Sequence, residues 1–259
     1  MESIAVVTGG AGGIGLATAA KLAQSHEAVF IVDINPDQIQ QSEQHMDLIG
    51  SGRLRTYRCD VTQQTDVERM AESISSQGKV RTLVNNAGAT ETGSLQQMTA
   101  EDWSRELTLN LHAAFLCFHV FAEPLKQSHG SVVNIASVNG LGFYGNPAYS
   151  AAKAGLIHFT KSIAVEFGKF GVRANAVAPG TVRTAVWDAK VRENPRLFEE
   201  VMQFYPLDRV IQPEDVASAV AFLANDQAAA ITGVCLPVDS GLTAGQPALG
   251  RAFSQSNSY

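Results

Sequence analysis

The sequence predicts a single α/β domain built on a doubly wound parallel sheet of about seven strands. Short apolar runs alternate along the 259 residues with longer segments whose apolar side chains recur at helical spacing. The runs Ile4–Val7 and Val29–Val32 are apolar throughout, as is typical of parallel strands that carry helices on both faces. Because strands and helices alternate, successive strands are expected to lie parallel to one another.

The expected elements follow in a regular order. The strands are predicted over 4–8, 28–33, 54–59, 82–85, 131–135, 173–178 and 234–238. The helices are predicted over 16–24, 38–48, 65–75, 100–124, 149–167 and 213–223. Two helix starts, Thr99–Asp102 and Gln212–Asp215, carry acidic residues in the first turn, where they lie near the positive end of the helix dipole.

Residues 1–245 are expected to form one domain, because 45% of the chain is hydrophobic and no change in composition divides it. Residues 181–212 separate a strand from its next helix by about thirty residues, and loops of that length commonly serve as lids or binding loops. The alternative is that this segment contacts another subunit. Residues 246–259 end in a run of small polar side chains and are predicted to be a tail that is flexible at its end.

The net charge of −6 argues against a nucleic-acid partner or an anionic membrane, because phosphate groups would be repelled. No uncharged apolar run approaches the length of a membrane span, about 20 residues. The first strand begins at Ile4, which leaves no room for a signal peptide and predicts a cytoplasmic protein. The three scattered cysteines have no Cys or His at ligand spacing, so we expect core thiols and no metal site.

A glycine-rich segment, Thr8–Gly15, follows the first strand and opens the first helix. Its glycines Gly9, Gly13 and Gly15 would permit a tight turn, let the backbone at Ile14 approach a pyrophosphate, and allow close packing of helix on sheet. The phosphates would lie at the helix N-terminus. The segment therefore predicts a dinucleotide site, although glycine turns between strand and helix also occur without a ligand.

Asp33 ends the second strand, where a carboxylate would accept hydrogen bonds from both hydroxyls of an adenosine ribose and repel a 2′-phosphate. No arginine or lysine lies in the glycine segment or in the two residues after Asp33. The prediction is therefore NAD rather than NADP. The alternative role for Asp33 is that of a turn residue at a strand end.

Two further strand ends carry polar and small residues. Asp60 and Val61 are candidates to bind and pack against adenine, and Asn86, Ala87 and Gly88 to flank the cofactor. Either group could be ordinary turn chemistry, since Asp, Asn and Gly are common in turns. Their occurrence at successive strand ends favours the ligand interpretation.

Ser137, Tyr149 and Lys153 are the candidates for acid–base chemistry. Tyr149 and Lys153 are four residues apart and would share one helix face, while Ser137 follows an apolar strand. An ordinary tyrosine has a pKa near 10, so a neighbouring ammonium and a cofactor cation are needed to favour the phenolate. The serine hydroxyl would then hold the substrate oxygen. Each residue also has an ordinary structural interpretation, as a turn serine, an interfacial tyrosine and a solvated lysine.

With these residues in this order, the chain resembles the compact form of the short-chain dehydrogenase/reductase family over essentially its whole length. The landmarks that carry the resemblance are Thr8–Gly15, Asn85–Gly88, Asn110, Ser137, Tyr149–Lys153 and Pro179–Thr184. The resemblance implies a Rossmann-like fold and a homotetramer. Asp33 resembles the NAD-preferring members of the family.

The resemblance also implies a role for each catalytic residue. Tyr149 would be the general acid/base, Ser137 would polarise the substrate oxygen, and Lys153 would lower the tyrosine pKa and bind the nicotinamide ribose. Asn110 would hold a water that joins Lys153 to a proton relay. The nicotinamide would be covered by Pro179, Gly180, Val182 and Thr184.

The sequence thus predicts an NAD-dependent oxidoreductase that interconverts a secondary alcohol and a ketone. The alternatives are an NADPH-dependent 3-oxoacyl thioester reductase and, more distantly, a non-catalytic dinucleotide sensor or scaffold on the same fold. The substrate is a small molecule that the sequence does not identify. Its pocket wall is expected from Thr90, Glu91, Asn139, Leu141, Phe143, Tyr144, Trp187 and Tyr205, with Arg183 nearby.

Overall fold

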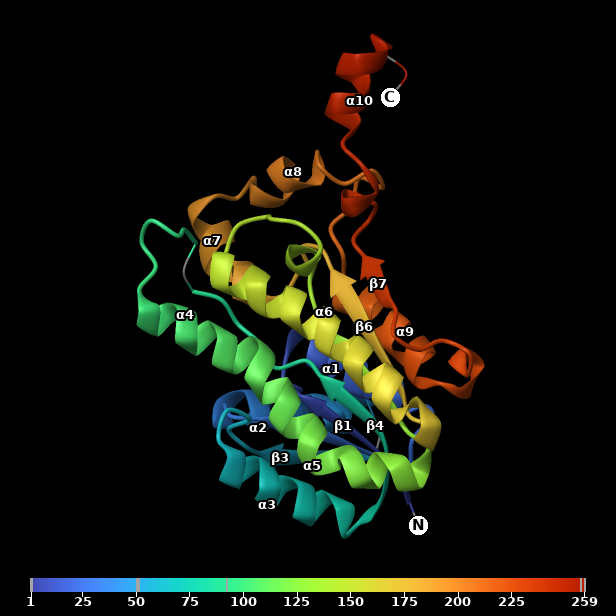
Figure 1. The fold of residues 1–259 in the computed structure, drawn as a ribbon. Coiled ribbons are helices and arrows are strands. Elements are labelled where there is room, and N and C mark those ends of the chain that lie inside the picture. The colour runs from blue at the N-terminus through green and yellow to red at the C-terminus, as the bar shows by residue number, and fades with distance from the viewer. Residues whose placement is uncertain (1, 50–51, 92, 257, 259) are drawn as a thin grey trace.

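The computed structural model describes residues 2–49, 52–91, 93–256 and 258, and it has the predicted α/β architecture (Figure 1). Seven parallel strands form one sheet in the order β3-β2-β1-β4-β5-β6-β7. Their bounds are β1 Glu2–Thr8, β2 Ala28–Asp33, β3 Leu54–Arg58, β4 Gly78–Asn85, β5 Ser131–Ile135, β6 Arg173–Pro179 and β7 Cys235–Val238. The doubly wound sheet is thereby confirmed.

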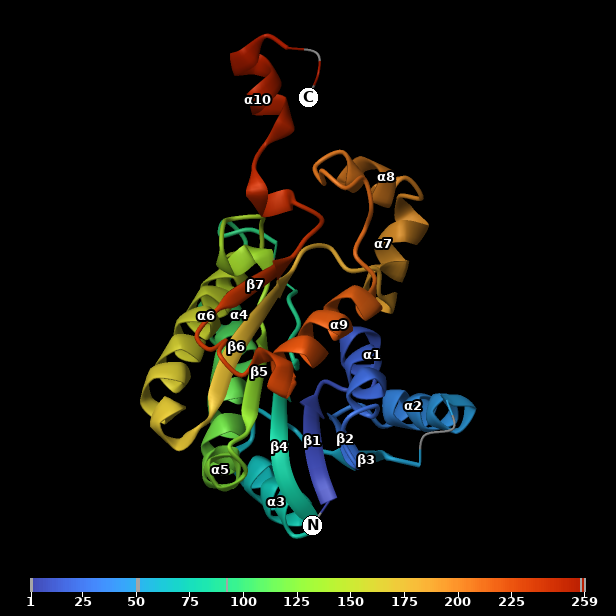
Figure 2. The same ribbon diagram turned by 90° about the vertical axis from the view of Figure 1, so that its right-hand side faces the viewer.

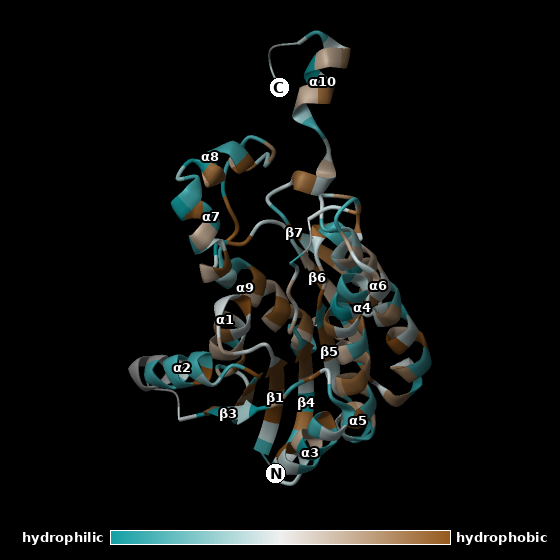
Figure 3. Cartoon of the chain, turned by 90° about the vertical axis from the view of Figure 1, so that its left-hand side faces the viewer, coloured by the Kyte–Doolittle hydropathy of each residue, from teal (hydrophilic) through white to brown (hydrophobic). Residues whose placement is uncertain are grey.

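Helices cover both faces of this sheet (Figures 1 and 2). The main helices are α1 Gly13–Leu22, α2 Pro36–Ile49, α3 Gln64–Ser75, α4 Ala100–Leu107, α5 Ala113–Ser128, α6 Pro147–Phe167 and α9 Pro213–Ala224. One apolar cluster packs α3, α5 and α6 on the strands, and a second packs α1 and α9 on the opposite face. Figure 3 shows the hydrophobic colour concentrated on the central strands.

The chain reverses its direction of winding between β1 and β4. The strands β2 and β3 lie on one side of β1, whereas β4 to β7 lie on the other. In a doubly wound sheet, the carboxyl ends of the strands on either side of such a switch point border a crevice. Thr8 and Asn85, which end β1 and β4, lie at that edge.

The expected helix over 100–124 is corrected in two ways. It consists of α4 and α5 joined by a π-helical segment, Thr108–His112, and it runs on past Pro124 to Ser128. His129, in the left-handed conformation with φ 50°, ends it. The two predicted helix starts are confirmed, because Thr99 and Gln212 both form capping boxes.

The long segment 181–212 contains the two short helices α7 Asp188–Glu193 and α8 Leu197–Met202. The two ends of this segment lie side by side, because Val182 and Ile211 form a parallel β-bridge. The C-terminal residues also form a helix that the sequence did not predict, α10 Pro247–Ser254, which extends away from the sheet (Figure 2). Within the described ranges, no helix combines the length and apolar character that crossing a membrane requires.

Candidate active site

A cleft of about 2040 Å³ lies along the carboxyl ends of the strands. The β1–α1 turn lines one part of it, and Ser137, Tyr149 and Lys153 line another. Segment 181–205 and the start of α10 border its outer side. The cleft therefore joins the predicted dinucleotide site to the predicted reacting groups.

The glycines of the β1–α1 turn have different physical roles. Gly9 and Gly13 adopt positive φ angles of 58° and 49°. A Cβ on Gly15 would lie 2.1 Å from the Gly9 carbonyl oxygen, so Gly15 allows helix and turn to pack together, and it does not line the cleft. A Cβ on Gly12, in contrast, would approach only Gln38, at 3.9 Å.

The N-terminus of α1 faces this cleft without a side-chain cap at Gly12. Its first-turn N–H groups have no intrahelical partners, and the helix dipole places partial positive charge there. Gly13 and Ile14 also line the cleft beside Gly12. A pyrophosphate fits these donors, because an anion satisfies them and meets no Cβ at Gly12.

Asp33 lines the cleft and is also engaged in the turn. Its carboxylate accepts hydrogen bonds from the Ala11 N–H at 3.2 Å and the Asn35 N–H at 3.1 Å. Asp33 therefore has the position of a turn residue, because it orders the glycine turn, and also the position of a possible ribose ligand, because it borders the cavity. The sequence reasoning overlooked Arg58, whose Cα pairs with that of Asp33 on β3 but which is not among the cleft-lining residues.

The side chains of Asn86 and Asp60 form hydrogen bonds that stabilise the turns at the cleft wall. The Asn86 amide donates to the carbonyls of Thr8 at 3.0 Å and Gly9 at 2.8 Å, which ties the end of β4 to that of β1. One Asp60 oxygen accepts from the Thr62 N–H at 2.9 Å and from its hydroxyl at 2.6 Å. Both residues line the cleft, together with Val61, Ala87 and Gly88.

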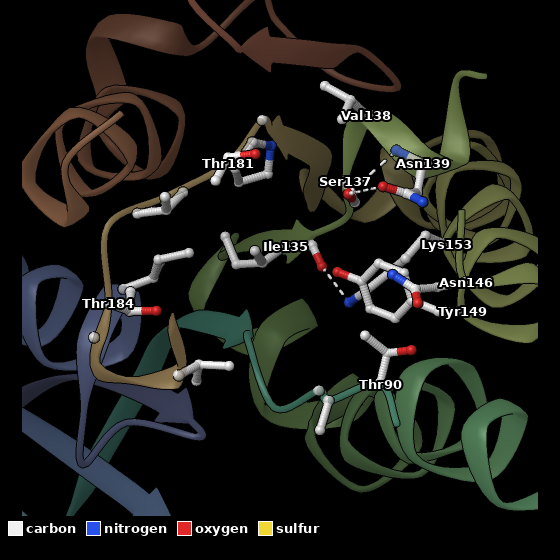
Figure 4. Close-up of a pocket in the computed structure, with 18 of the residues that line it drawn as sticks. Thr90, Ile135, Ser137, Val138, Asn139, Asn146, Tyr149, Lys153, Thr181 and Thr184 are labelled. Atoms are coloured by element: carbon white, nitrogen blue, oxygen red, sulfur yellow. Dashed lines mark hydrogen bonds between the residues drawn. The ribbon is translucent and has the colours of Figure 1, made fainter. Parts of the chain in front are cut away.

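Tyr149 and Lys153 lie one turn apart near the start of α6 (Figure 4). The Lys153 side chain is buried, and its Nζ donates to the Ile135 carbonyl at 2.7 Å. This nitrogen lies 5.4 Å from the centre of the Tyr149 ring. The Oγ of Ser137, after β5, accepts from the Asn139 N–H at 3.2 Å. The cleft therefore brings together the three residues that the sequence singled out.

The surroundings shift the pKa of both titratable groups at this centre. Burial raises the pKa of Tyr149, a hydrogen bond with Ser137 lowers it, and the Glu106 carboxylate raises it. Burial lowers the pKa of Lys153 to about 8. A neutral phenol therefore lies beside an ammonium group that gives up its proton more readily than an ordinary lysine, which is a suitable starting point for proton exchange near neutral pH.

Asn110 lies in the π-helical segment between α4 and α5, where it is buried behind the cleft wall and not part of its lining. Its amide donates to the carbonyls of Ala89 at 2.7 Å and Glu106 at 2.9 Å. Its Oδ1 is buried and has no hydrogen-bond partner. A Cβ on Gly88 would lie 2.6 Å from this oxygen and 3.3 Å from Lys153 Nζ. The unpaired acceptor therefore points to the same place as the lysine donor.

The segment after β6 closes the cleft on a further side. Pro179, Gly180, Val182 and Thr184 all line the cavity, as expected. The Tyr205 hydroxyl accepts from the Thr181 N–H and donates to its Oγ1, both at 2.9 Å. Tyr205 thereby fixes the start of segment 181–212.

Six of the eight predicted wall residues line the cleft, and two do not. Leu141 and Phe143 lie outside the lining, with Phe143 70% exposed. The sequence reasoning also missed Glu106, Lys190 and Arg251. Glu106 precedes Asn110 by four residues, so both lie on one helix face, but nothing in that spacing distinguishes a buried glutamate from an exposed one.

The comparisons with known proteins agree with this architecture. Residues 9–243 match the family profile described as enoyl-(acyl carrier protein) reductase. An oxidoreductase of the short chain dehydrogenase/reductase family from Burkholderia thailandensis, known from its crystal structure, is 37% identical in sequence. It covers 100% of both chains with a TM-score of 0.93. The chain belongs to the short-chain dehydrogenase/reductase family. It is therefore an oxidoreductase of a family that acts on small molecules with CH–OH type groups and binds a nicotinamide dinucleotide.

Sequence relatives are similar over nearly the whole chain. An uncharacterized oxidoreductase of Schizosaccharomyces pombe is 36% identical over 261 residues, which cover 99% of this chain and 97% of the relative. The 3-oxoacyl-[acyl-carrier-protein] reductase FabG of Thermotoga maritima is 35% identical over 244 residues, covering 92% and 97%. Both relatives are therefore similar to this short-chain dehydrogenase/reductase over nearly their whole length.

Proposed function

We propose that this enzyme interconverts a secondary alcohol and a ketone with NAD, and that Tyr149 is its general acid/base. One observation carries the proposal. Tyr149, Ser137 and Lys153 line the same cleft as the glycine turn at the uncapped start of α1. A hydride acceptor and a proton acceptor can therefore meet at one substrate carbon and its oxygen.

The residues present suit a dinucleotide along the whole cleft. Gly9, Gly13 and Ile14 would hold the pyrophosphate, with Gly15 shaping the turn beneath it. The adenosine would meet Asp33, Asp60 and Val61, and the central part would pass Asn86, Ala87 and Gly88. The nicotinamide end would meet Tyr149, Lys153, Pro179, Gly180, Val182 and Thr184. The chemistry that the cofactor supplies there is hydride exchange.

The protein's own groups manage the oxygen and its proton. In the oxidation direction, the Tyr149 phenolate removes the hydroxyl proton while the Ser137 hydroxyl holds the same oxygen. In the reduction direction, the neutral phenol returns that proton. We propose that Lys153 favours the phenolate and that a water on Asn110 Oδ1 relays protons to Lys153. The unpaired buried Oδ1 supports this role, because leaving such an acceptor unsatisfied costs about 1–3 kcal/mol.

The choice of NAD over NADP rests on Asp33. A carboxylate at that place accepts hydrogen bonds from ribose hydroxyls, whereas it repels a 2′-phosphate. The basic residues that line the cleft are Arg105, Lys153, Lys190 and Arg251. None of the four belongs to the glycine turn or to the end of β2, where a 2′-phosphate would lie.

An NADPH-dependent 3-oxoacyl thioester reductase is the second candidate. The relatives from Thermotoga maritima and Synechocystis carry the name 3-oxoacyl-[acyl-carrier-protein] reductase. The family profile is described as enoyl-(acyl carrier protein) reductase, which also names a substrate carried by acyl carrier protein. The wide cleft would admit an extended substrate. Asp33 argues against this candidate, because its carboxylate would repel the 2′-phosphate of NADPH.

We also propose that segment 181–212 closes over the substrate and that the enzyme is a homotetramer. The first proposal is supported by the position of this segment along the cleft. The second is supported by an exposed aromatic row that runs from the end of the π-helical segment into α5, in which Phe115 stacks on His112 and on His119. Phe115 is also in contact with Phe159 of α6, so the row joins two helices.

The test is the change in nicotinamide absorbance with two sets of compounds. Secondary alcohols, polyols and hydroxy acids are offered with NAD and NADP in parallel, and 3-oxoacyl thioesters are offered with NADH and NADPH in parallel. Turnover of an alcohol with NAD is the expected result. Turnover of thioesters with NADPH alone would favour the second candidate. Dinucleotide binding without turnover of any compound would favour a sensor.

A further inference from the structure

Glu106 is a buried carboxylate in an otherwise surface-exposed helix. It is 3% exposed and is the one residue of α4 that is buried. Burying a charged group is costly unless it finds hydrogen-bond partners. The carboxylate of Glu106 is therefore expected to have hydrogen-bond partners inside the protein, and the structure shows them.

The carboxylate of Glu106 holds a short stretch of the cleft wall. Both of its oxygens lie 3.2 Å from the Thr90 hydroxyl, which donates to them, and one accepts the Glu91 N–H at 3.0 Å. Thr90 and Glu91 line the cleft. Figure 4 shows Thr90 beside Tyr149, so this wall borders the proposed reacting phenol.

The backbone of Glu106 takes part in the same arrangement. Its carbonyl accepts from the Asn110 amide, which also donates to the Ala89 carbonyl. Glu106 and Asn110, which lie one helical turn apart, thus form hydrogen bonds with all three residues of the segment 89–91. These bonds hold this part of the cleft wall in one conformation, so that it offers the same surface to every substrate molecule.

Charged and polar groups of three elements surround Tyr149. Lys153 lies on its own helix α6, and Ser137, in the turn after β5, forms a hydrogen bond with it. Glu106 of α4 reaches this place through Thr90, whose hydroxyl donates to its carboxylate and which lies beside Tyr149 in Figure 4. The negative charge of Glu106 disfavours the phenolate and so raises the pKa of Tyr149. Arg105, next to Glu106 in sequence, is paired with Glu91 and Asp102.

We propose that Glu106 is a positioning residue that fixes Thr90 and Glu91 as the substrate wall and places its carboxylate directly behind this wall, on the side of the cleft that borders Tyr149. This inference rests on the proposed role of Tyr149. It adds that the protonation of the phenol is balanced between Lys153 on one side and Glu106 on the other. An uncharged glutamine at 106 would keep the wall's acceptor and lose the charge.

The direct test is Glu106→Gln with Glu101→Gln as the matched control, since Glu101 is exposed on the same helix. The phenolate absorbance of each protein is titrated with pH, and the signal of Tyr149 is isolated by subtracting the same protein with Tyr149→Phe. The Tyr149 transition should move to lower pH in Glu106→Gln, because the negative charge that disfavours the phenolate is gone. It should not move in Glu101→Gln. An unmoved transition in Glu106→Gln overturns the inference.

The pH profile of alcohol oxidation separates this inference from the proposed function. Oxidation needs the phenolate, so its acidic limb should move to lower pH in Glu106→Gln by the same amount as the absorbance transition. If the absorbance transition moves and the limb does not, the placement of Glu106 stands and the assignment of Tyr149 as the base fails.

A second variant covers the case in which Glu106→Gln does not fold. Thr90→Val keeps the Glu106 charge and removes one donor to it. KM for the substrate should rise, because the wall loses a contact, while the Tyr149 transition should not move to lower pH. A downward movement in Thr90→Val would contradict the proposed effect of the charge.

Discussion

The ammonium nitrogen of Lys153 lies 5.4 Å from the centre of the Tyr149 ring. Its hydrogen bond to the Ile135 carbonyl fixes it to the end of β5. The lysine is thus held beside the phenol by the sheet and not only by the helix that both residues share. The spacing of four residues predicted a common face, and the strand end supplies the precise placement.

Replacing Tyr149 by Phe should lower kcat by about 10²–10⁴-fold, the usual contribution of a positioned acid or base. The phenyl ring keeps the packing, so the dissociation constant for NADH should be unchanged. Stopped-flow or steady-state absorbance gives kcat, and fluorescence titration gives the binding constant.

The matched control is Tyr57→Phe, which removes the same atom from a tyrosine of β3 that does not line the cleft. Its kcat should equal that of the unmodified enzyme. Retained turnover in Tyr149→Phe would show that another group exchanges the substrate proton.

Replacing Asp33 by Asn should reduce the preference for NAD over NADP by about tenfold or more, since a hydrogen bond to a charged group contributes about 1.5–3 kcal/mol. The asparagine oxygen can still accept the Ala11 N–H, which preserves the turn. The measurement is the ratio of kcat/KM with the two cofactors.

Asp37→Asn is the control for Asp33→Asn, because Asp37 is exposed in the first turn of α2 and carries the same charge. Its cofactor ratio should stay constant. An unchanged ratio in Asp33→Asn as well would mean that ribose discrimination lies elsewhere, with Arg58 as the next residue to change.

Gly12→Ala should weaken dinucleotide binding without loss of stability, whereas Gly15→Ala should lower the stability of the protein itself. An alanine Cβ at 12 meets only Gln38, at 3.9 Å, so the melting temperature should be unchanged while the dissociation constant for the dinucleotide rises. A Cβ at 15 would lie 2.1 Å from the Gly9 carbonyl oxygen. Overpacking of this kind costs about 1–3 kcal/mol, so the melting temperature should fall.

Calorimetry without ligand and titration with NADH distinguish the two effects. If Gly12→Ala binds NADH as tightly as the unmodified enzyme, the phosphates do not approach the backbone there. If Gly15→Ala has the same melting temperature as the unmodified enzyme, the turn can accommodate a Cβ at position 15 and the proposed packing constraint is wrong.

The sequence was sufficient to predict the sheet and the placement of Tyr149 and Lys153 on one helix face, because both rest on local signals. Apolar runs mark buried strands wherever they occur, and Tyr149 and Lys153 share a face through helical spacing alone.

Other features depend on contacts between distant segments and left no local signal. The π-helical turn at Asn110 and the burial of Glu106 arise where α4 meets residues 89–91. The same holds for Phe143, an aromatic residue of the predicted wall that is largely exposed. The helix α10 was missed because its sequence is short, with Pro247 at its start and polar residues beyond it.

The stability of the enzyme should depend on pH through Lys153. Burial lowers the pKa of Lys153 to about 8, whereas an unfolded lysine has its ordinary value of 10.5. Between these values the unfolded chain binds more protons, so the free energy of unfolding rises with pH. The gap corresponds to about 3 kcal/mol, a cost that is fully present below pH 8 and is relieved toward pH 10.5.

Lys153→Met removes this titration, and Lys161→Met, on the exposed face of the same helix, leaves it in place. Denaturant unfolding at pH 7 and pH 10 gives the free energies. The difference between the unmodified enzyme and Lys153→Met should grow in favour of the unmodified enzyme as the pH rises, because only its lysine sheds an unfavourable buried charge. The difference between the unmodified enzyme and Lys161→Met should stay nearly constant. A flat difference for Lys153→Met would mean that the folded lysine titrates as it does in water, and that its charge is compensated within the cleft.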